Sequence, residues 1–444
     1  MAEPLEAFKN AFKIPELKSR IIFTLVMLGL YRLGCHVPTP GVDGGALAEK
    51  IRGGGGGLLG LYDLFTGGAM TNATVFALGI MPYITASIVL SLLIPVIPSL
   101  ERLQKMGQEG QKKITEYTRY GTIGLCMFQA VGIGIWLQRQ GAEIVPNPGI
   151  GFLLLCVVSF TTGTAFIMWQ GEQISEHGVG NGMSLIIFTS IVSSMPSAVI
   201  TLFQMLRNDQ MTILTALILM FLMVAVVAGA ILVTTGQRRI PVQYPRQVKG
   251  RRVSGGQRTY LPLRVNQAGV IPIIFASSIL MLPAMMSNAL PVGKIQQIFN
   301  FFFDNGRMGY DILYALLIIF FSFFYTAITF NPVEMAENMK KYGGVIVGVR
   351  PGKATADYLN RVMTRITLAG SIFLAVVALL PTVIFNVLDV NDWNIVHFFG
   401  GTSLLILVGV ALDTIKQIEQ HLIMRHYDGF STKGGGRIRA RRGF

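Results

Sequence analysis

Charged residues are scarce in this sequence. Only 14% of its 444 residues are Asp, Glu, Lys or Arg, whereas 52% are hydrophobic. A soluble domain has about 25% charged residues, and a chain of this length needs them to cover the surface of its cores. The composition therefore excludes an ordinary water-soluble globular protein and indicates that much of the chain faces lipid.

Cysteine and histidine are also scarce. Cys35, Cys126 and Cys156 are isolated from one another, the five histidines are scattered, and the sequence has no CxxC pair or Cys/His cluster. This pattern argues against both a disulfide framework and a zinc site. No glycine-rich stretch ends in GK[ST], which argues against a phosphate-binding loop. The sequence thus predicts no cofactor and no metal.

Long apolar runs are what the sequence has instead. A bilayer core needs roughly 20 residues of helix, and runs of that length recur along the chain. They cover residues 21–38, 74–97, 118–137, 151–170, 183–206, 212–235, 266–288, 310–330, 366–386 and 398–417. Residues 215–233 are continuously apolar rather than alternating, which argues against a β-barrel. We therefore predict an all-α integral membrane protein with ten transmembrane helices.

Positive charge is distributed unevenly between the predicted loops. If the N-terminus is cytosolic, 29 of the 37 Lys and Arg residues lie in cytosolic segments and six lie outside. The positive-inside rule then predicts that both termini are cytoplasmic. Residues 1–20 are interpreted as an amphipathic helix on the cytosolic surface, with a frayed basic tail as the alternative.

Charge within the spans is almost absent. Arg32 lies in the first span and is interpreted as reaching outward to water, and Asp413 and Lys416 lie at the cytosolic end of the tenth. A secondary transporter of small solutes is the alternative function, but it needs ionisable or ion-coordinating groups at mid-membrane. An intramembrane protease needs a catalytic pair at depth, and no such pair is present. Both functions are therefore disfavoured.

Two kinds of irregular segment suggest specific functions. Residues 58–66, bounded by glycines, are too short to cross the bilayer and form either a re-entrant helix or an ordinary external loop helix. The cytosolic loops 236–265 and 332–365 are long and basic, and the first has the turn signals of a β-hairpin. They suit either binding to RNA backbone or an acidic motor protein, or only topology and anionic lipid.

Eight segments of the sequence are distinctive. They are LFTGGAMTNATVFALGIMPYITASI (64–88), GQKKITEYTRYGT (110–122), GEQISEHGVGNGMSLIIF (171–188), GQRRIPV (236–242), LPLRVNQAGVIPIIFASSI (261–279), FFYTAITFNP (323–332), VGVRPGKATADYL (347–359) and FGGTSLLI (399–406). In order and over nearly the whole chain, they closely resemble the SecY/Sec61-alpha family of protein-translocation channels. The glycine run at 53–57 and the tail 434–444 are outside this resemblance.

The resemblance implies a fold and a set of site residues. It implies two five-helix halves, 1–206 and 207–444, related as an inverted repeat, with a channel between them. The implied pore ring is Ile80, Ile84, Ile187, Ile274 and Ile406. The implied plug is the re-entrant piece 58–73, with Leu61, Tyr62, Leu64, Phe65, Gly67 and Gly68. The implied lateral gate is Thr85, Gln129 and Asn266, for which ordinary helix–helix contact is the alternative.

The resemblance also implies partners and a location. The channel would conduct unfolded polypeptide across the bacterial inner membrane and release transmembrane segments into lipid, without catalysis. Its partners would be SecE, SecG, the SecA ATPase, ribosomes, signal sequences and membrane lipid, with YidC and SecD/SecF as further candidates. SecA and ribosomes would dock on the cytosolic loops, through Arg246, Lys249, Arg251, Arg252 and Arg350.

Overall fold

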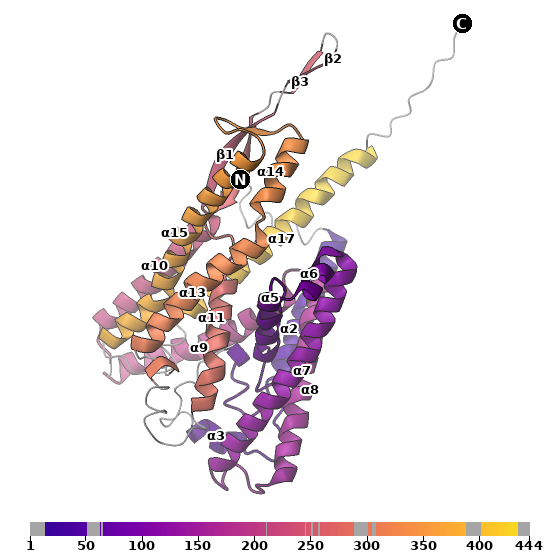
Figure 1. The fold of residues 1–444 in the computed structure, drawn as a ribbon. Coiled ribbons are helices and arrows are strands. Elements are labelled where there is room, and N and C mark those ends of the chain that lie inside the picture. The colour runs from indigo at the N-terminus through magenta and orange to yellow at the C-terminus, as the bar shows by residue number, and fades with distance from the viewer. Residues whose placement is uncertain are drawn as a thin grey trace.

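A computed structural model gives the architecture of the protein as a bundle of long helices (Figure 1). It describes residues 14–50, 63, 65–209, 211–244, 246–249, 252–255, 258–287, 301–303, 308–387 and 401–433. Each of the ten predicted spans overlaps a helix. These helices are α2 (Pro15–Gly34), α5 (Met81–Leu93), α7 (Gln108–Arg139), α8 (Ile150–His177), α9 (Gly182–Arg207), α10 (Ile213–Thr235), α11 (Ile271–Ser287), α13 (Met308–Thr329), α15 (Lys353–Val387) and α17 (Gly401–Lys433).

Most of these helices are long and apolar enough to cross a bilayer. Within the described residues, seven stretches meet that condition, or eight if α5 and the following α6 (Pro98–Lys105), bent by 99°, count as one span. Helix α10 is the least enclosed, since only 17% of its most apolar stretch is buried. Leu217, Phe221 and Leu232 on α10 are largely exposed, as expected of side chains that face lipid.

The two remaining predicted spans differ from the others for physical reasons. Helix α2 has 20 residues, and any 18 consecutive residues of it include the three charged residues Lys18, Arg20 and Arg32. The mean hydropathy of each such stretch is therefore low. Helix α11 has only 17 residues. Helix α2 also begins at Pro15, so residues 15–20 continue into the first span rather than forming a separate surface helix. Residues 1–13 of that predicted surface helix lie outside the described part of the chain.

The second predicted span is shorter than expected. We expected a helix over 74–97, but residues 74–80 form turns and α5 starts only at Met81. Gly79 explains the late start, because its φ of +54° lies in the left-handed region that interrupts a right-handed helix. A Cβ at Gly79 would also lie 2.8 Å from Thr66 Cγ2. The chain before α5 is therefore free to pack as a compact, non-helical segment.

Short helices and strands lie at the two ends of the bundle. Helix α3 (Gly44–Lys50) is at one end and α14 (Pro332–Lys341) at the other (Figure 1). Asn331 caps α14, since its side chain accepts hydrogen bonds from the backbone N–H groups of Val333 and Glu334. Helix α13 thus ends at Thr329, and α14 starts as a separately capped helix after two intervening residues.

Strands form in the two basic loops and join them. Strand β1 (Gln237–Gln243) pairs antiparallel with β4 (Arg258–Arg264), and β2 (Arg246–Lys249) pairs with β3 (Arg252–Gly255), which confirms the hairpin expected in loop 236–265. Strand β5 (Val345–Ile346) of the second loop also pairs with β1. The sequence did not indicate this third strand, because two residues give no detectable period. The helical fold is confirmed, and these strands are an addition to it.

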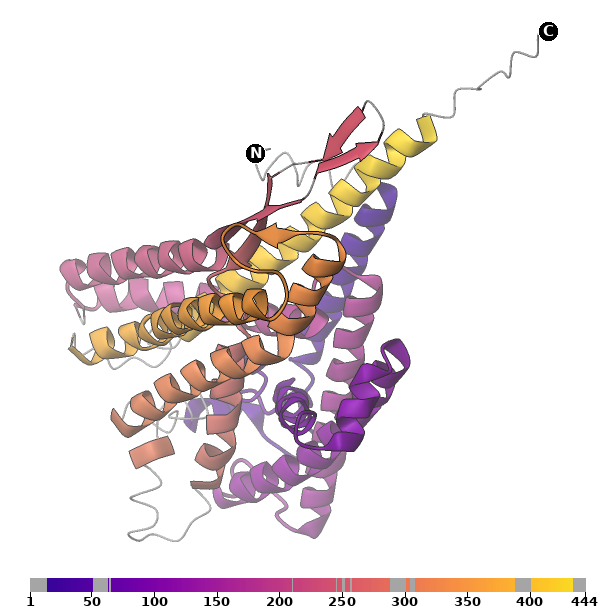
Figure 2. The same ribbon diagram turned by 45° about the horizontal axis from the view of Figure 1, so that its top comes forward.

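The helices form two groups that share one core. In Figure 1, α5, α7 and α8 lie together on one side, and α10, α13 and α15 lie on the other. Figure 2 shows the same separation after a 45° turn. One hydrophobic cluster of buried residues includes members of both groups. The interface between the groups is consequently apolar and closely packed.

Candidate functional site: the apolar centre, its plug segment and the cytosolic loops

The five isoleucines expected to line a pore lie in this shared core. They come from four helices that are far apart in sequence, α5, α9, α11 and α17. Their relative exposures are 2% for Ile80, 6% for Ile84, 1% for Ile187, 5% for Ile274 and 0% for Ile406, and all belong to the same cluster. The structure therefore buries all five in the same apolar core, which is much larger than the expected ring.

Ile80 and Ile84 are placed by the break before α5. Ile80 is the residue that caps the helix, and its carbonyl accepts a hydrogen bond from the Ile84 N–H at 3.2 Å. Residues four apart lie on one face of a helix, so both side chains point to the same side of α5. Helix α9 starts with a side-chain cap from Asn181, six residues before Ile187. The starts of α5 and α9 thus lie close in sequence to three of the isoleucines.

The plug segment is represented by Asp63 and residues 65–73. Phe65 is 4% exposed and Thr66 is fully buried, while Gly67 and Gly68 both have positive φ. Leu61, Tyr62 and Leu64 lie outside the described residues. The described part is folded back on itself: Asp63 accepts hydrogen bonds from Thr71 N at 2.8 Å and from Thr71 Oγ1 at 2.5 Å.

The sequence led us to expect that Arg32 reaches outward to water, but the structure shows a different orientation. Its Nη1 donates a hydrogen bond to the Gly67 carbonyl of the plug segment. The preceding Tyr31 is 1% exposed, and its hydroxyl lies 2.7 Å from Ser190 Oγ on α9 and 3.3 Å from the Thr66 carbonyl. Buried carbonyls need donors, and for Gly67 the guanidinium supplies one, so Arg32 turns inward.

The expected gate residues are buried, but they do not hydrogen-bond one another. Thr85 Oγ1 donates to the Met81 carbonyl at 3.0 Å, and Asn266 Nδ2 donates to the Gly269 carbonyl at 2.9 Å. Gln129 Oε1 has no hydrogen-bond partner among the described residues. Asn266 also precedes α11 instead of lying inside it. The helices that carry them do meet, because α5 contacts both α7 and α11.

A small polar cavity adjoins Asn266 near the two basic loops. Its volume is about 130 Å³, and its charged lining residues are Arg264, Asp413 and Lys416. Neither Thr85 nor Gln129 is among its lining residues. Asn266 is therefore part of the lining of this charged cavity among α10, α11, α13 and α17.

The expected docking residues lie at one end of the molecule. Arg246, Lys249 and Arg252 are on the β2–β3 hairpin, where Lys249 is opposite Arg252. Arg251 lies outside the described residues. Arg350 is exposed, and its carbonyl accepts a hydrogen bond from Thr355 Oγ1 at 2.8 Å. Because β5 pairs with β1, the two loops form one connected structure (Figures 1 and 2).

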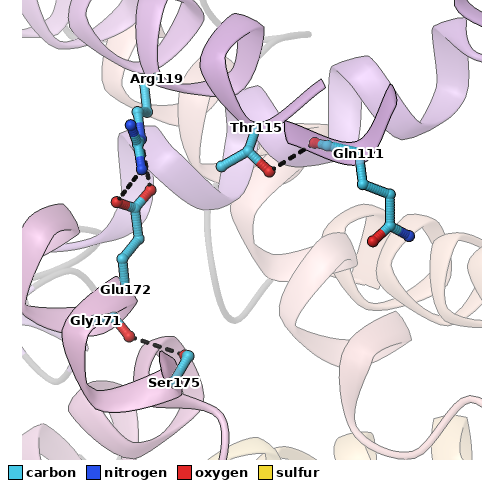
Figure 3. Close-up of polar contacts among 6 residues, drawn as sticks. All are labelled: Gln111, Thr115, Arg119, Gly171, Glu172 and Ser175. Carbon is cyan, nitrogen blue, oxygen red and sulfur yellow. Dashed lines mark hydrogen bonds and ion pairs between the residues drawn. The ribbon is translucent and has the colours of Figure 1, made fainter. Parts of the chain in front are cut away.

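An ion pair fastens α7 to α8 near the loop end of the bundle. Arg119 Nε and Nη2 donate to Glu172 Oε1 and Oε2 at 2.9 and 2.7 Å. Figure 3 shows the two side chains pointing toward each other from their separate helices. This two-pronged geometry is the strongest that Arg and a carboxylate form. The sequence placed both residues in distinctive segments without indicating that they would meet.

Comparison with known proteins matches most of this chain to one family. The SecY family model matches residues 74–415, which include all five isoleucines and the gate residues. The chain belongs to the SecY family.

Curated SecY relatives match the chain over nearly its full length. Protein translocase subunit SecY of Aquifex aeolicus is 44% identical, and the match covers 96% of this chain and 99% of that protein. The Streptomyces coelicolor protein of the same name is 47% identical, with the same two coverages. Homologues at this identity and coverage share one fold along the whole chain, so the ten spans are those of the SecY family.

Solved structures agree with the fold. A structure described as a protein conducting channel has a TM-score of 0.61 and 17% identity, covering 91% of this chain and 92% of its own. A second, whose title assigns closed-state stabilisation to the plug domain of SecY, has a TM-score of 0.61 and 18% identity with the same coverages. A Sec61 chain from a canine ribosome–channel complex gives a TM-score of 0.57 at 16% identity.

Proposed function

We propose that this SecY-family chain is the channel subunit of a protein translocase, through which unfolded polypeptides cross the membrane. The single observation that supports this most is that the five isoleucines, which come from four helices of both halves, are all buried in the same apolar core. Composition alone would not select these residues, since apolar side chains are ordinary core. A closable pore between the two helix groups would need apolar side chains from both groups, and these five supply them.

The chemistry of an apolar waist suits a passing chain. Apolar constrictions exclude water and ions by dewetting, and branched aliphatic side chains can move apart without breaking hydrogen bonds. A ring of charges would instead retain ions and bind some segments too tightly. We propose that Ile80, Ile84, Ile187, Ile274 and Ile406 form this seal and that residues 58–73 close it from the outer side as a plug.

The two halves are proposed to be 1–206 and 207–444, opening like a clamshell. The seam between α5 and α11 is the proposed lateral gate, and a contact between Ser278 Oγ and Met81 Sδ at 3.6 Å already joins the two helices there. Thr85, Gln129 and Asn266 would give this seam a polar character, since each is buried on a helix or turn beside it. Signal sequences and new transmembrane segments would leave through it into lipid.

The partners proposed for this chain follow its cytosolic charge. The exposed Arg350 and the basic hairpin suit the carboxylates of a motor ATPase such as SecA or the phosphates of ribosomal RNA. The Sec61 relative in the canine ribosome–channel complex supports the ribosome as a partner. SecE and SecG are the proposed membrane subunits, with YidC and SecD/SecF as occasional partners.

We propose that the chain is a passive conduit in the bacterial inner membrane with both termini in the cytoplasm. Energy for transport would come from the partners rather than from catalysis by this chain. Among the described residues, no group of three or more His, Cys, Asp or Glu side chains is placed to hold a metal ion. The proposed role depends on the shape and polarity of the path.

Reconstitution tests this function directly. The chain, co-purified with SecE and SecG, is placed in vesicles with SecA, ATP and an unfolded secretory precursor. We expect the precursor to become resistant to external protease only when all components and ATP are present. Accumulation of a small solute against a gradient, with no protected precursor, would instead support a secondary transporter, the alternative function.

A further inference from the structure

The contacts between α2 and the plug segment have no role in the function proposed so far. Tyr31 and Arg32 lie in the last turn of α2 and Cys35 caps its C-terminal end, and all three contact the same short stretch of backbone. Arg32 binds the Gly67 carbonyl, and Tyr31 Oη and Cys35 Sγ lie 3.3 and 3.7 Å from the Thr66 carbonyl. Three side chains on one helix thus meet two adjacent backbone carbonyls.

The geometry of the plug segment makes this approach close. Gly67 has a φ of +66°, and a Cβ there would lie 3.1 Å from Arg32 Nη1 and 3.1 Å from Ser190 Cα. Only glycine adopts this backbone conformation in so narrow a space without strain. Gly67 therefore lets its carbonyl lie between α2 and α9, where the guanidinium reaches it.

The described plug residues form a unit that these contacts can hold as a whole. Besides the Asp63–Thr71 hydrogen bonds, Gly68 N and Thr66 Oγ1 donate to the Asp63 carbonyl at 3.0 and 3.2 Å. Asp63 and residues 65–71 are thus tied into one compact turn, here called the turn 63–71. A contact at residues 66 and 67 consequently restrains the whole turn.

The other end of the segment is attached to the chain that follows α2. Thr39 N donates to the Ala73 carbonyl at 2.9 Å, and Val75 N donates to the Val37 carbonyl at 3.0 Å. These backbone bonds form a short antiparallel bridge at Pro38 and Thr74. The compact turn 63–71 therefore lies between a backbone hinge at 73–75 and the side-chain contacts from α2.

We propose that Arg32, assisted by Tyr31, is the latch that holds the plug segment closed, by binding its backbone carbonyls rather than its side chains. This inference rests on the proposed channel function. The guanidinium offers several donors in a fixed fork, and charge-assisted hydrogen bonds are stronger than neutral ones. When the turn 63–71 swings out about the hinge, these hydrogen bonds break first, and Arg32 is a positioning residue for the closed state.

Cys35 provides a built-in reporter for this motion. Its side chain is 1% exposed and touches the Thr66 carbonyl, so departure of the turn uncovers it. The other two cysteines, Cys126 and Cys156, are fully buried in α7 and α8 and can be replaced by Ala. Modification of Cys35 by a membrane-impermeant maleimide added from outside then measures how often the plug segment is open.

The experiment compares Arg32→Gln and Tyr31→Phe with the parent, all assembled with SecE and SecG. Arg139→Gln is the matched control, because Arg139 is also in the last turn of a span but is exposed. We expect Arg32→Gln to raise both the Cys35 modification rate and the resting ion conductance by about tenfold, as for loss of one charge-assisted hydrogen bond. Tyr31→Phe should raise both by a smaller factor, and Arg139→Gln should leave them unchanged.

Three results would overturn the latch. One is that both α2 variants show the same Cys35 modification rate and conductance as the parent. If Arg32→Gln does not assemble, Tyr31→Phe alone decides, because that variant keeps the aromatic ring in place. Another is an equal rise in Arg139→Gln, which would show a general charge effect. The third is modification without any rise in conductance. Failure of the parent to export precursor would instead contradict the channel function, independently of these outcomes.

Discussion

The buried isoleucines and the exposed Arg350 represent opposite kinds of functional residue. An isoleucine in the apolar centre acts by excluding water, so its effect depends on its neighbours. Arg350 acts through its own charge and donors, so it can be changed with little effect on packing. These differences lead to separate predictions at the scale of single residues.

Polar substitution of the seal should make the channel leak. Replacing Ile84, Ile187 and Ile274 together by Asn places amides where apolar side chains exclude water. We expect higher ion conductance in planar bilayers and relaxed selectivity for signal sequences. Ile→Val at the same three positions keeps the region apolar and is the control, which should conduct like the parent. Equal tightness of the Asn and Val channels would show that these residues are not the seal.

Charge reversal at Arg350 should stop motor-driven export. Arg350→Glu removes a planar fork suited to carboxylates and phosphates and adds a repulsive charge, while the exposed site tolerates the change structurally. We expect loss of SecA-driven translocation in reconstituted vesicles, with normal assembly with SecE. Lys353→Glu is the matched control, since Lys353 is exposed on the same loop. Equal losses in both variants would favour a merely topological or lipid-binding role for the loop.

At the scale of elements, two ion pairs among the described residues allow the strength of a pair between helices to be compared with that of a pair within one helix. The Arg119–Glu172 pair joins two helices with two hydrogen bonds, and the side chains are 46% and 20% exposed. The Lys105–Glu101 pair lies within α6, with exposures of 73% and 47%. Less exposure and two-pronged geometry should make the first pair the stronger.

A double-mutant cycle with Arg119→Gln and Glu172→Gln should measure this difference. We expect a coupling of about 1 kcal/mol in denaturant unfolding of the detergent-solubilised protein, near the upper end for partly exposed pairs. The same cycle at Lys105 and Glu101 should give a smaller coupling, because that pair is more exposed and lies within one helix. A coupling no larger at Arg119–Glu172 would mean that this pair does not fasten α7 to α8.

The elements differ in how far sequence could predict them. The spans were predictable because an apolar run of about 20 residues is itself the physical requirement for crossing lipid. The break at Gly79 and the pairing of β5 with β1 were not, because both depend on neighbours distant in sequence. The sequence marked Arg32 as unusual, because it is a lone charge in an apolar span. The direction of its side chain could not be predicted, because it depends on the Gly67 carbonyl. The isoleucines had no signal apart from family resemblance.

At the scale of the whole molecule, the distribution of charge predicts its orientation. Cysteines introduced at Ser254 and Lys353 should resist a membrane-impermeant maleimide added from outside, because both positions lie in the basic loops. Glu49→Cys in α3, at the opposite end of the bundle (Figure 1), is the positive control and should be labelled. The native cysteines are buried and give little background. Labelling at Ser254 or Lys353 from outside would reverse the predicted topology.

The pairing of β1 with β5 has a mechanical consequence. Strand β1 continues from α10, β4 leads to α11, and β5 lies between α14 and α15. A buried cluster beneath the sheet includes Ile240, Ile346 and Leu359 and so ties the strands to the start of α15. A force applied to either loop is therefore shared among several helices of residues 207–444. A partner that pulls on one loop therefore moves that group of helices together, because the loop is rigidly connected to them.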